Sequence, residues 1–265
     1  MEFDVSYPPT AAAQVAFMIG DPVAHTALPR GVNEWAAGAG KNVLMTPALV
    51  APEALDGFLG ALRVMRNCGG AVVTAPHKQA AASRADELTD AARLVGAANL
   101  MVRQPGGALV GDNIDGQGFV AALAAVGTVS AIGRAILFGC GGAGASIGAA
   151  LIEAGILALD LVDLDAERAG SLARRLGSRS CPVARPGSVE AYGLIINATT
   201  VGLDGTSMVH PLSGLSPRSV VADVITEPAM TPFLLRASQL GARVQTGPQM
   251  ALAQLPLLAR AFGWE

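Results

Sequence analysis

The feature that most constrains the fold of this chain is a glycine cluster in residues 135–165. Residues 135–138 are a short apolar run typical of a buried strand. Gly139, Gly141 and Gly144 follow this run with the spacing Gly-x-Gly-x-x-Gly. Glycine lets a backbone turn sharply and come close to another group. The chain is therefore expected to make a tight turn here, with a backbone that a ligand can approach closely.

The residues beyond the cluster explain what could approach it. A stretch of small residues at 145–154 predicts a helix, and an apolar run at 156–162 predicts a second strand that ends at Asp163. Asp163 lies 19 positions after Gly144. In dinucleotide-binding units a pyrophosphate lies against the glycines and the helix start, and an acid about 20 residues further on binds the ribose. The stretch predicts such a unit.

Composition excludes several classes of protein. The chain has 265 residues, of which 51% are hydrophobic and 15% charged, as expected of a well-buried α/β protein. A net charge of −3 without a long basic run argues against nucleic acid as a partner. No apolar run is long enough to predict a membrane span. The three cysteines and three histidines show no metal-ligand or redox spacing, so we expect no metal and a reducing, cytoplasmic location.

Apolar runs and helical periodicity alternate along the chain, which is typical of a mostly parallel sheet. Strands are expected at residues 14–20, 42–47, 69–74, 97–102, 109–112, 135–138, 156–162, 192–197, 219–224 and 243–246. Helices are expected at residues 30–37, 52–66, 78–84, 86–94, 115–125, 145–154, 166–176, 231–240 and 247–262.

Seven short motifs, in order along almost the whole chain, resemble the shikimate dehydrogenase family, which includes the quinate/shikimate dehydrogenases. They are IGDPVAH at 19–25, TAPHK at 74–78, GAAN at 96–99, GDNIDG at 111–116, NATTVG at 197–202, residues 223–232, and Met250-x-x-x-Gln254.

The resemblance implies an α/β protein of two domains. Residues 1–115 would form an α/β substrate-binding catalytic domain, and residues 116–247 a Rossmann-type NAD-binding domain with a parallel sheet. The C-terminal helix, residues 248–265, would pack back on the N-terminal domain. Such an enzyme oxidises a ring hydroxyl of a hydroaromatic substrate reversibly, by hydride transfer with a nicotinamide cofactor.

The resemblance also implies roles for individual residues. Lys78 and Asp115 would be the catalytic pair, because oxidation of an alcohol needs a cation beside the oxygen and a proton carrier within reach. From the residues alone, a solvated lysine at a helix start and a helix N-cap are the alternatives. The substrate-binding residues would be Thr26, Thr74, Asn99 and Gln254. The cofactor-binding residues would be Gly139, Gly141, Gly142, Ala143, Asp163, Arg168, Thr199, Gly247 and Met250.

The residues after the second predicted strand indicate which cofactor is used. Asp163 can accept hydrogen bonds from both ribose hydroxyls and repels a 2′-phosphate. By resemblance, NADP-using relatives have an arginine at the position of Leu164, and that arginine would hold the 2′-phosphate. We therefore expect NAD to be preferred, with residual use of NADP through the nearby Arg168.

The substrate side departs from the family pattern. The family has two serines for the substrate carboxylate where this chain has Thr26 and Leu28, and Leu28 cannot bond an anion. An asparagine is replaced by Val72 and a tyrosine by Thr226. A buried carboxylate without partners is costly, so either Arg30 holds the anion or the substrate differs.

Three functions remain open at this point. The first is an NAD-dependent dehydrogenase of the shikimate/quinate type. The second is a dehydrogenase of the same architecture with a different cyclic substrate. The third is a non-catalytic sensor that binds NAD. Alanine-rich helix faces are compatible with a homodimer.

Overall fold

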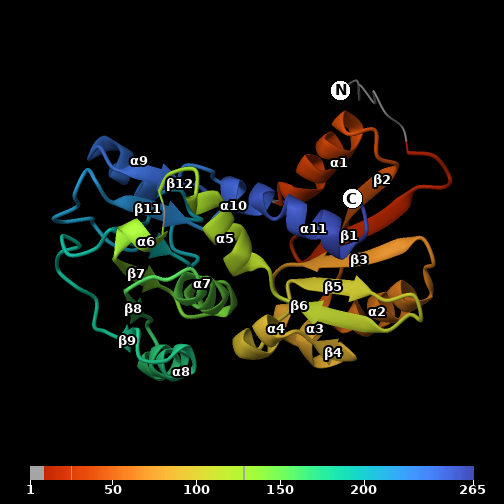
Figure 1. The fold of residues 1–265 in the computed structure, drawn as a ribbon, viewed down its shortest axis with the longest axis horizontal. Helices are drawn as coiled ribbons and strands as arrows, with labels where there is room; N and C mark the ends of the chain where they lie inside the picture. The colour runs from red at the N-terminus through yellow and green to blue at the C-terminus, as the bar shows by residue number, and fades with distance from the viewer. Residues whose placement is uncertain (1–8, 25, 128) are drawn as a thin grey trace. The chain divides into compact units, whose positions relative to one another are not determined.

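The computed structural model describes residues 9–24, 26–127 and 129–265, apart from the side chains of residues 130 and 131. His25, which closes the first family motif, lies outside the described residues. The chain divides into two compact units (Figure 1). The first unit runs to Ile114 and includes Leu255–Glu265, and the second is Asp115–Gln254.

The first unit is built on a mixed sheet of six strands in the order β2-β1-β3-β5-β6-β4. Its strands are β1 (Gln14–Gly20), β2 (Val43–Leu49), β3 (Cys68–Val73), β4 (Glu87–Leu88), β5 (Leu100–Arg103) and β6 (Leu109–Asp112). Strand β1 is parallel to β2 and β3, and β5 is antiparallel to β3 and β6. The carboxyl ends of β1 and β3 therefore lie at the same edge of the sheet as the start of β5.

Helices cover both faces of this sheet, in two apolar cores. The helices are α1 (Leu28–Gly38), η1 (Pro52–Ala54), α2 (Leu55–Val64), α3 (Lys78–Arg84), α4 (Asp90–Val95) and α11 (Leu255–Ala261). Alternate residues of a strand point to opposite faces. Met18 and Val72 accordingly pack with α1 and α11, while Ile19 and Val73 pack with α2 and α3. The expected return of the C-terminal helix to this unit is confirmed for α11, whereas residues 248–254 belong to the second unit.

The second unit holds an all-parallel sheet in the order β12-β11-β10-β7-β8-β9. The strand order reverses between β7 and β10 at the centre of the sheet. Its strands are β7 (Arg134–Phe138), β8 (Ala158–Val162), β9 (Ser180–Pro182), β10 (Leu194–Asn197), β11 (Val220–Asp223) and β12 (Arg243–Gln245). This is the doubly wound order in which a ligand lies at the carboxyl ends of the two central strands. The expected Rossmann-type sheet is confirmed.

Helices also cover both faces of the second sheet. They are α5 (Asp115–Leu123), α6 (Val129–Ile132), α7 (Gly142–Glu153), α8 (Ala166–Leu176), α9 (Pro232–Gln239) and α10 (Gly247–Ala253). Gly148 brings α7 against Leu137 and Leu159 on one face, and on the other Ile136 packs with Phe233 of α9. Among the helices of the described ranges, none is long and apolar enough to cross a membrane.

Two predicted helices are wrong in detail. Residues 86–94 are not one helix, because β4 pairs with β6 before α4 begins after Thr89, whose side chain caps it. Residues 247–262 are two helices, α10 and α11, separated at Gln254. Pro256 has no backbone N–H to donate and fits only the first turn of a helix, so α11 starts anew. The first sheet is also less parallel than expected, because β5 runs against both neighbours.

Candidate active site

The glycine turn after β7 has the geometry that a bound pyrophosphate requires. Gly139 has a φ of 96°, and its N–H donates to the carbonyl of Val162 (2.8 Å). A Cβ on Gly144 would collide with the Gly139 carbonyl, so α7 approaches the turn closely only because residue 144 is glycine. Gly141 is exposed, has open space where a Cβ would be, and leaves the start of α7 without a side-chain cap. The N–H groups at this helix start therefore suit a phosphate group.

Asp163 is tied to the same turn. Its carboxylate accepts hydrogen bonds from the N–H groups of Cys140 (2.7 Å) and Asp165 (2.9 Å), and Arg168 lies 3.5 Å away. The Asp163 side chain is only 8% exposed, whereas Leu164 beside it is 97% exposed. Burial and the Asp163 charge raise the pKa of the Cys140 thiol to about 12, so the thiol stays protonated at neutral pH.

A buried polar network supports the loop that follows β10. Asn197 donates to the carboxylate of Asp223 (3.0 Å) and accepts hydrogen bonds from both the N–H and the hydroxyl of Thr199. Thr231 also donates to Asp223 (2.8 Å). Burial raises the pKa of Asp223, while the hydrogen bonds that it accepts oppose the shift. The network places Thr199 against Gly139, so the loops after β7 and β10 meet.

Asp115 and Gln254 come together within the second unit. Asp115 begins α5, and Gln254 directly follows α10 and donates to the Asp115 carboxylate (3.4 Å). Gly118 allows this approach, since a Cβ there would collide with the Gln254 side chain. Gly247 starts α10 against backbone carbonyls at residues 224 and 225, and Met250 of the same helix is buried.

Lys78, Thr74 and Asn99 gather at one edge of the first sheet. Thr74 directly follows β3 and its N–H donates to the carbonyl of Ile19 (2.8 Å). Lys78 begins α3, is half-buried, and its carbonyl accepts from the N–H of Ala98 (2.9 Å). Asn99 is buried, and its side-chain oxygen accepts from the N–H of Ile114 (2.8 Å), the residue before Asp115.

The other residues of this edge offer little to an anion. Thr26 is half-buried, and its hydroxyl donates to the carbonyl of Val23 (2.8 Å). Leu28 is buried in the apolar core. Arg30 is exposed and pairs with Glu34 (2.7 Å) on the same helix.

Sequence reasoning missed several polar residues that hold the site in place. Asp223, Thr231, Asn113 and Ser146 are buried; Ser146 accepts a hydrogen bond from the N–H of Gly116 (2.8 Å), and Asn113 donates to the carbonyl of Ala97 (3.0 Å). A polar residue at the end of an apolar run, such as Asp223 after VVA, is the signal that could have found them.

Comparisons with known proteins agree with this geometry. The shikimate dehydrogenase substrate binding domain matches residues 18–101. Shikimate dehydrogenase (NADP(+)) of Rhodospirillum rubrum is 39% identical, over 92% of this chain and 90% of the relative. The chain belongs to the shikimate dehydrogenase family. It is an oxidoreductase of the shikimate/quinate dehydrogenase type, with NAD(P) as cofactor.

Two solved structures of the same fold show how the family varies. Ligand-free 5-ketofructose reductase of Gluconobacter sp. strain CHM43 is 27% identical with a TM-score of 0.85, over 96% of this chain and 94% of the other. Quinate dehydrogenase of Corynebacterium glutamicum in complex with NAD is 25% identical with a TM-score of 0.84, over 96% and 94%. Together with the NADP(+)-named relative of R. rubrum, these names show that relatives of this chain differ in substrate and in cofactor.

Proposed function

We propose that this chain oxidises a ring hydroxyl reversibly by hydride transfer with NAD, and that Lys78 and Asp115 are its catalytic pair. The observation that carries the proposal is the position of Lys78, one of two lysines in the chain. It starts a helix at the carboxyl edge of β3, and its backbone is fixed to the segment that bears Asn99. This edge is where α/β proteins place ligands. The first unit would bind the substrate and the second the cofactor.

The residues divide the chemistry between them. When bound, the nicotinamide ring supplies the acceptor or donor of hydride. The Lys78 ammonium stabilises negative charge on the substrate oxygen and can exchange a proton with it. The Asp115 carboxylate would take the proton from the lysine and pass it onward. Gln254, which donates to Asp115, holds that carboxylate in place, and Asn99 hydrogen-bonds substrate hydroxyls.

The glycine turn fits a dinucleotide, and the end of β8 favours NAD. A side chain at residue 144 would collide with the Gly139 carbonyl in the turn, whereas the position of a Cβ on Gly141 is open space. The Asp163 carboxylate, fixed by the N–H of Cys140, would face the adenosine ribose and repel a 2′-phosphate. Leu164 offers no charge to such a phosphate. The relative from R. rubrum is named as NADP(+)-dependent and the quinate dehydrogenase was solved with NAD, so both cofactors occur among the relatives of this chain.

The substrate is the second open question. A hydroaromatic acid such as shikimate or quinate needs a partner for its carboxylate. The Thr26 hydroxyl already donates to a backbone carbonyl, Leu28 is apolar, and Arg30 pairs with Glu34. These contacts favour a second candidate, a neutral polyhydroxy alcohol or its ketone. The similarity to a 5-ketofructose reductase supports this candidate.

Steady-state rates on a substrate panel test both candidates. Shikimate, quinate, a carboxylate-free cyclic polyol and 5-ketofructose should each be assayed with NAD(H) and NADP(H). Turnover of the acids indicates the hydroaromatic candidate, and turnover of only the neutral compounds indicates the second. Binding of NAD without turnover of any of them would support the non-catalytic sensor.

Variants test the catalytic pair. Lys78→Ala and Asp115→Asn should each lower kcat by roughly 100-fold or more, the usual contribution of acid–base catalysis. Lys41→Ala is the matched control, because Lys41 is the other lysine and is also half-buried. Equal kcat in the Lys78 and Lys41 variants would contradict the assignment.

A further inference from the structure

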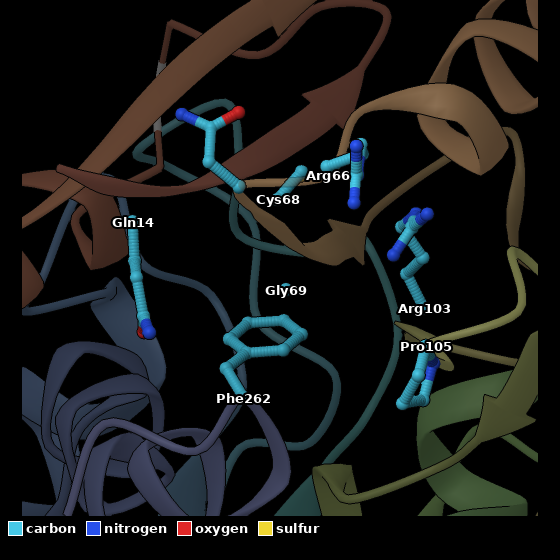
Figure 2. Close-up of a pocket in the computed structure, with 8 residues that line it drawn as sticks. Gln14, Arg66, Cys68, Gly69, Arg103, Pro105 and Phe262 are labelled. Carbon is cyan, nitrogen blue, oxygen red and sulfur yellow. The ribbon is translucent and has the colours of Figure 1, made fainter. Parts of the chain in front are cut away.

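We propose that a hollow in the first unit binds a small organic anion with a carboxylate or phosphate group. The hollow has a volume of about 400 Å³ and is lined at the start of β1 by Gln14, at the start of β3 by Cys68, and at the end of β5 by Arg103. Figure 2 shows these residues with Arg66 and with Phe262, which follows α11. Because β1 and β3 begin here, the hollow lies at the opposite edge of the sheet from Thr74 and does not depend on the proposed function.

The arginines of the first unit carry the argument. Five of its seven arginines pair with a carboxylate among the described residues: Arg30 with Glu34, Arg63 with Asp86, Arg84 with Asp56, Arg93 with Asp90, and Arg260 with Glu265. The two others, Arg66 and Arg103, form no ion pair within the described part of the chain, and both line this hollow.

No acidic residue of the described ranges lines the hollow. Figure 2 shows the guanidinium groups of Arg66 and Arg103 on the same wall. Two like charges that share a wall repel each other, and an anion between them removes that repulsion and accepts charge-assisted hydrogen bonds from both. The charge pattern thus selects an anion.

One of the two arginines is already fixed in place. Arg103 is half-buried, and its Nε donates to the carbonyl of Arg63 (2.9 Å) and its Nη1 to the carbonyl of Gln104 (3.2 Å). Guanidinium has five N–H donors, so these two bonds orient the group and leave other donors for a ligand. A guanidinium held in this way loses less side-chain entropy when an anion binds.

The remaining lining residues select an organic ligand over a bare ion. Phe262 is buried, with 7% of its surface exposed, and its ring packs against Gly69, whereas Pro105 is exposed and adds apolar surface to the hollow. The Gln14 amide can hydrogen-bond hydroxyl groups, and the Asn67 amide, whose Nδ2 donates to the carbonyl of Ala13 (3.0 Å), keeps its oxygen as an acceptor. The hollow therefore suits a body with a ring that carries the anionic group.

Isothermal titration calorimetry of the full chain at low salt measures binding at this site. The probes are benzoate, phenyl phosphate and inorganic phosphate. Benzoate and phenyl phosphate separate the two anionic groups, and inorganic phosphate reports binding without a ring. The variants are Arg66→Gln, Arg103→Gln and the double variant. Arg93→Gln is the matched control, since Arg93 is a partly exposed arginine of the same unit outside the hollow. Arg168→Gln controls for anion binding at the glycine turn.

We expect saturable binding of at least one organic probe, weakened by roughly tenfold in each single variant and lost in the double variant. Arg93→Gln should bind like the natural chain, and Arg168→Gln should keep the binding that the double variant loses. Thermal melts of each variant without ligand check folding, and Arg103→Lys keeps the charge should Arg103→Gln fail to fold. Three results would overturn the proposal: no saturable binding of either organic probe, unchanged binding in the double variant, or loss of binding only in Arg168→Gln.

Discussion

Replacement of Leu164 by arginine should shift the cofactor preference toward NADP. Leu164 is 97% exposed, so the substitution buries nothing and leaves no cavity. A new guanidinium at this position can reach the 2′-phosphate that distinguishes NADP from NAD. A hydrogen bond to a charged group contributes about 1.5–3 kcal/mol, and exposure to solvent favours the lower end of this range. We therefore expect the ratio of kcat/KM for NADP to that for NAD to rise about tenfold.

A second substitution should increase the shift at a cost in stability. Asp163→Asn removes the negative charge, so with Leu164→Arg we expect roughly another tenfold change in the ratio. The Asp163 carboxylate accepts from the N–H groups of both Cys140 and Asp165, and one of these would lose its acceptor. A lost acceptor of this kind costs about 1–3 kcal/mol. The free energy of unfolding should fall by that amount in the double variant and stay unchanged in the single variant.

Steady-state kinetics with both cofactors, at constant ionic strength, measures the effect. Leu157→Arg is the matched control, because Leu157 is 70% exposed and lies at the opposite end of β8. It adds the same charge to the same unit. Equal ratios in Leu164→Arg and Leu157→Arg, or a natural chain that already prefers NADP, would refute the reasoning.

Three further predictions concern stability. Tyr192→Phe removes a hydrogen bond to the buried carboxylate of Asp160 (2.6 Å) and should lower the free energy of unfolding by about 1–2 kcal/mol in urea titrations; an unchanged value would contradict this. Because burial raises the pKa of Asp223, the folded state holds this proton more tightly than the unfolded state, and stability should fall as the pH rises above about 4. Asp223→Asn should flatten that slope in urea titrations across pH, and an equal slope in both proteins would count against the argument. The indole N–H of Trp264 has no hydrogen-bond partner among the described residues. Trp264→Phe should therefore lower the free energy of unfolding by under about 1 kcal/mol, far less than Trp264→Ala at about 3–5 kcal/mol. Similar losses in the two variants would show that the indole ring itself is required.

Sequence patterns predicted the bounds of a helix or strand correctly where the residues that start and end it lie within the segment itself. The strand at 14–20 and the helices at 78–84 and 166–176 begin and end as expected. Asp165 explains the last case, because its side chain caps α8. The prediction of one helix at residues 86–94 is wrong because β4 forms only through its pairing with β6, a strand more than 20 positions further along the chain. No pattern within 86–94 carries that information.

The sequence by itself determined the family, the Gly-x-Gly-x-x-Gly turn and the acid at residue 163, because backbone sterics and spacing are properties of neighbouring residues. Only the tertiary structure decided where polar and charged side chains are used. In the tertiary structure the Thr26 hydroxyl donates to a backbone carbonyl, and Asp223 is buried in a network with Asn197. Arg66 and Arg103 line one hollow that contains no acid from the described part of the chain. Hydrogen bonds and ion pairs join residues that are distant along the chain, so their partners depend on how the sheets and helices fold together.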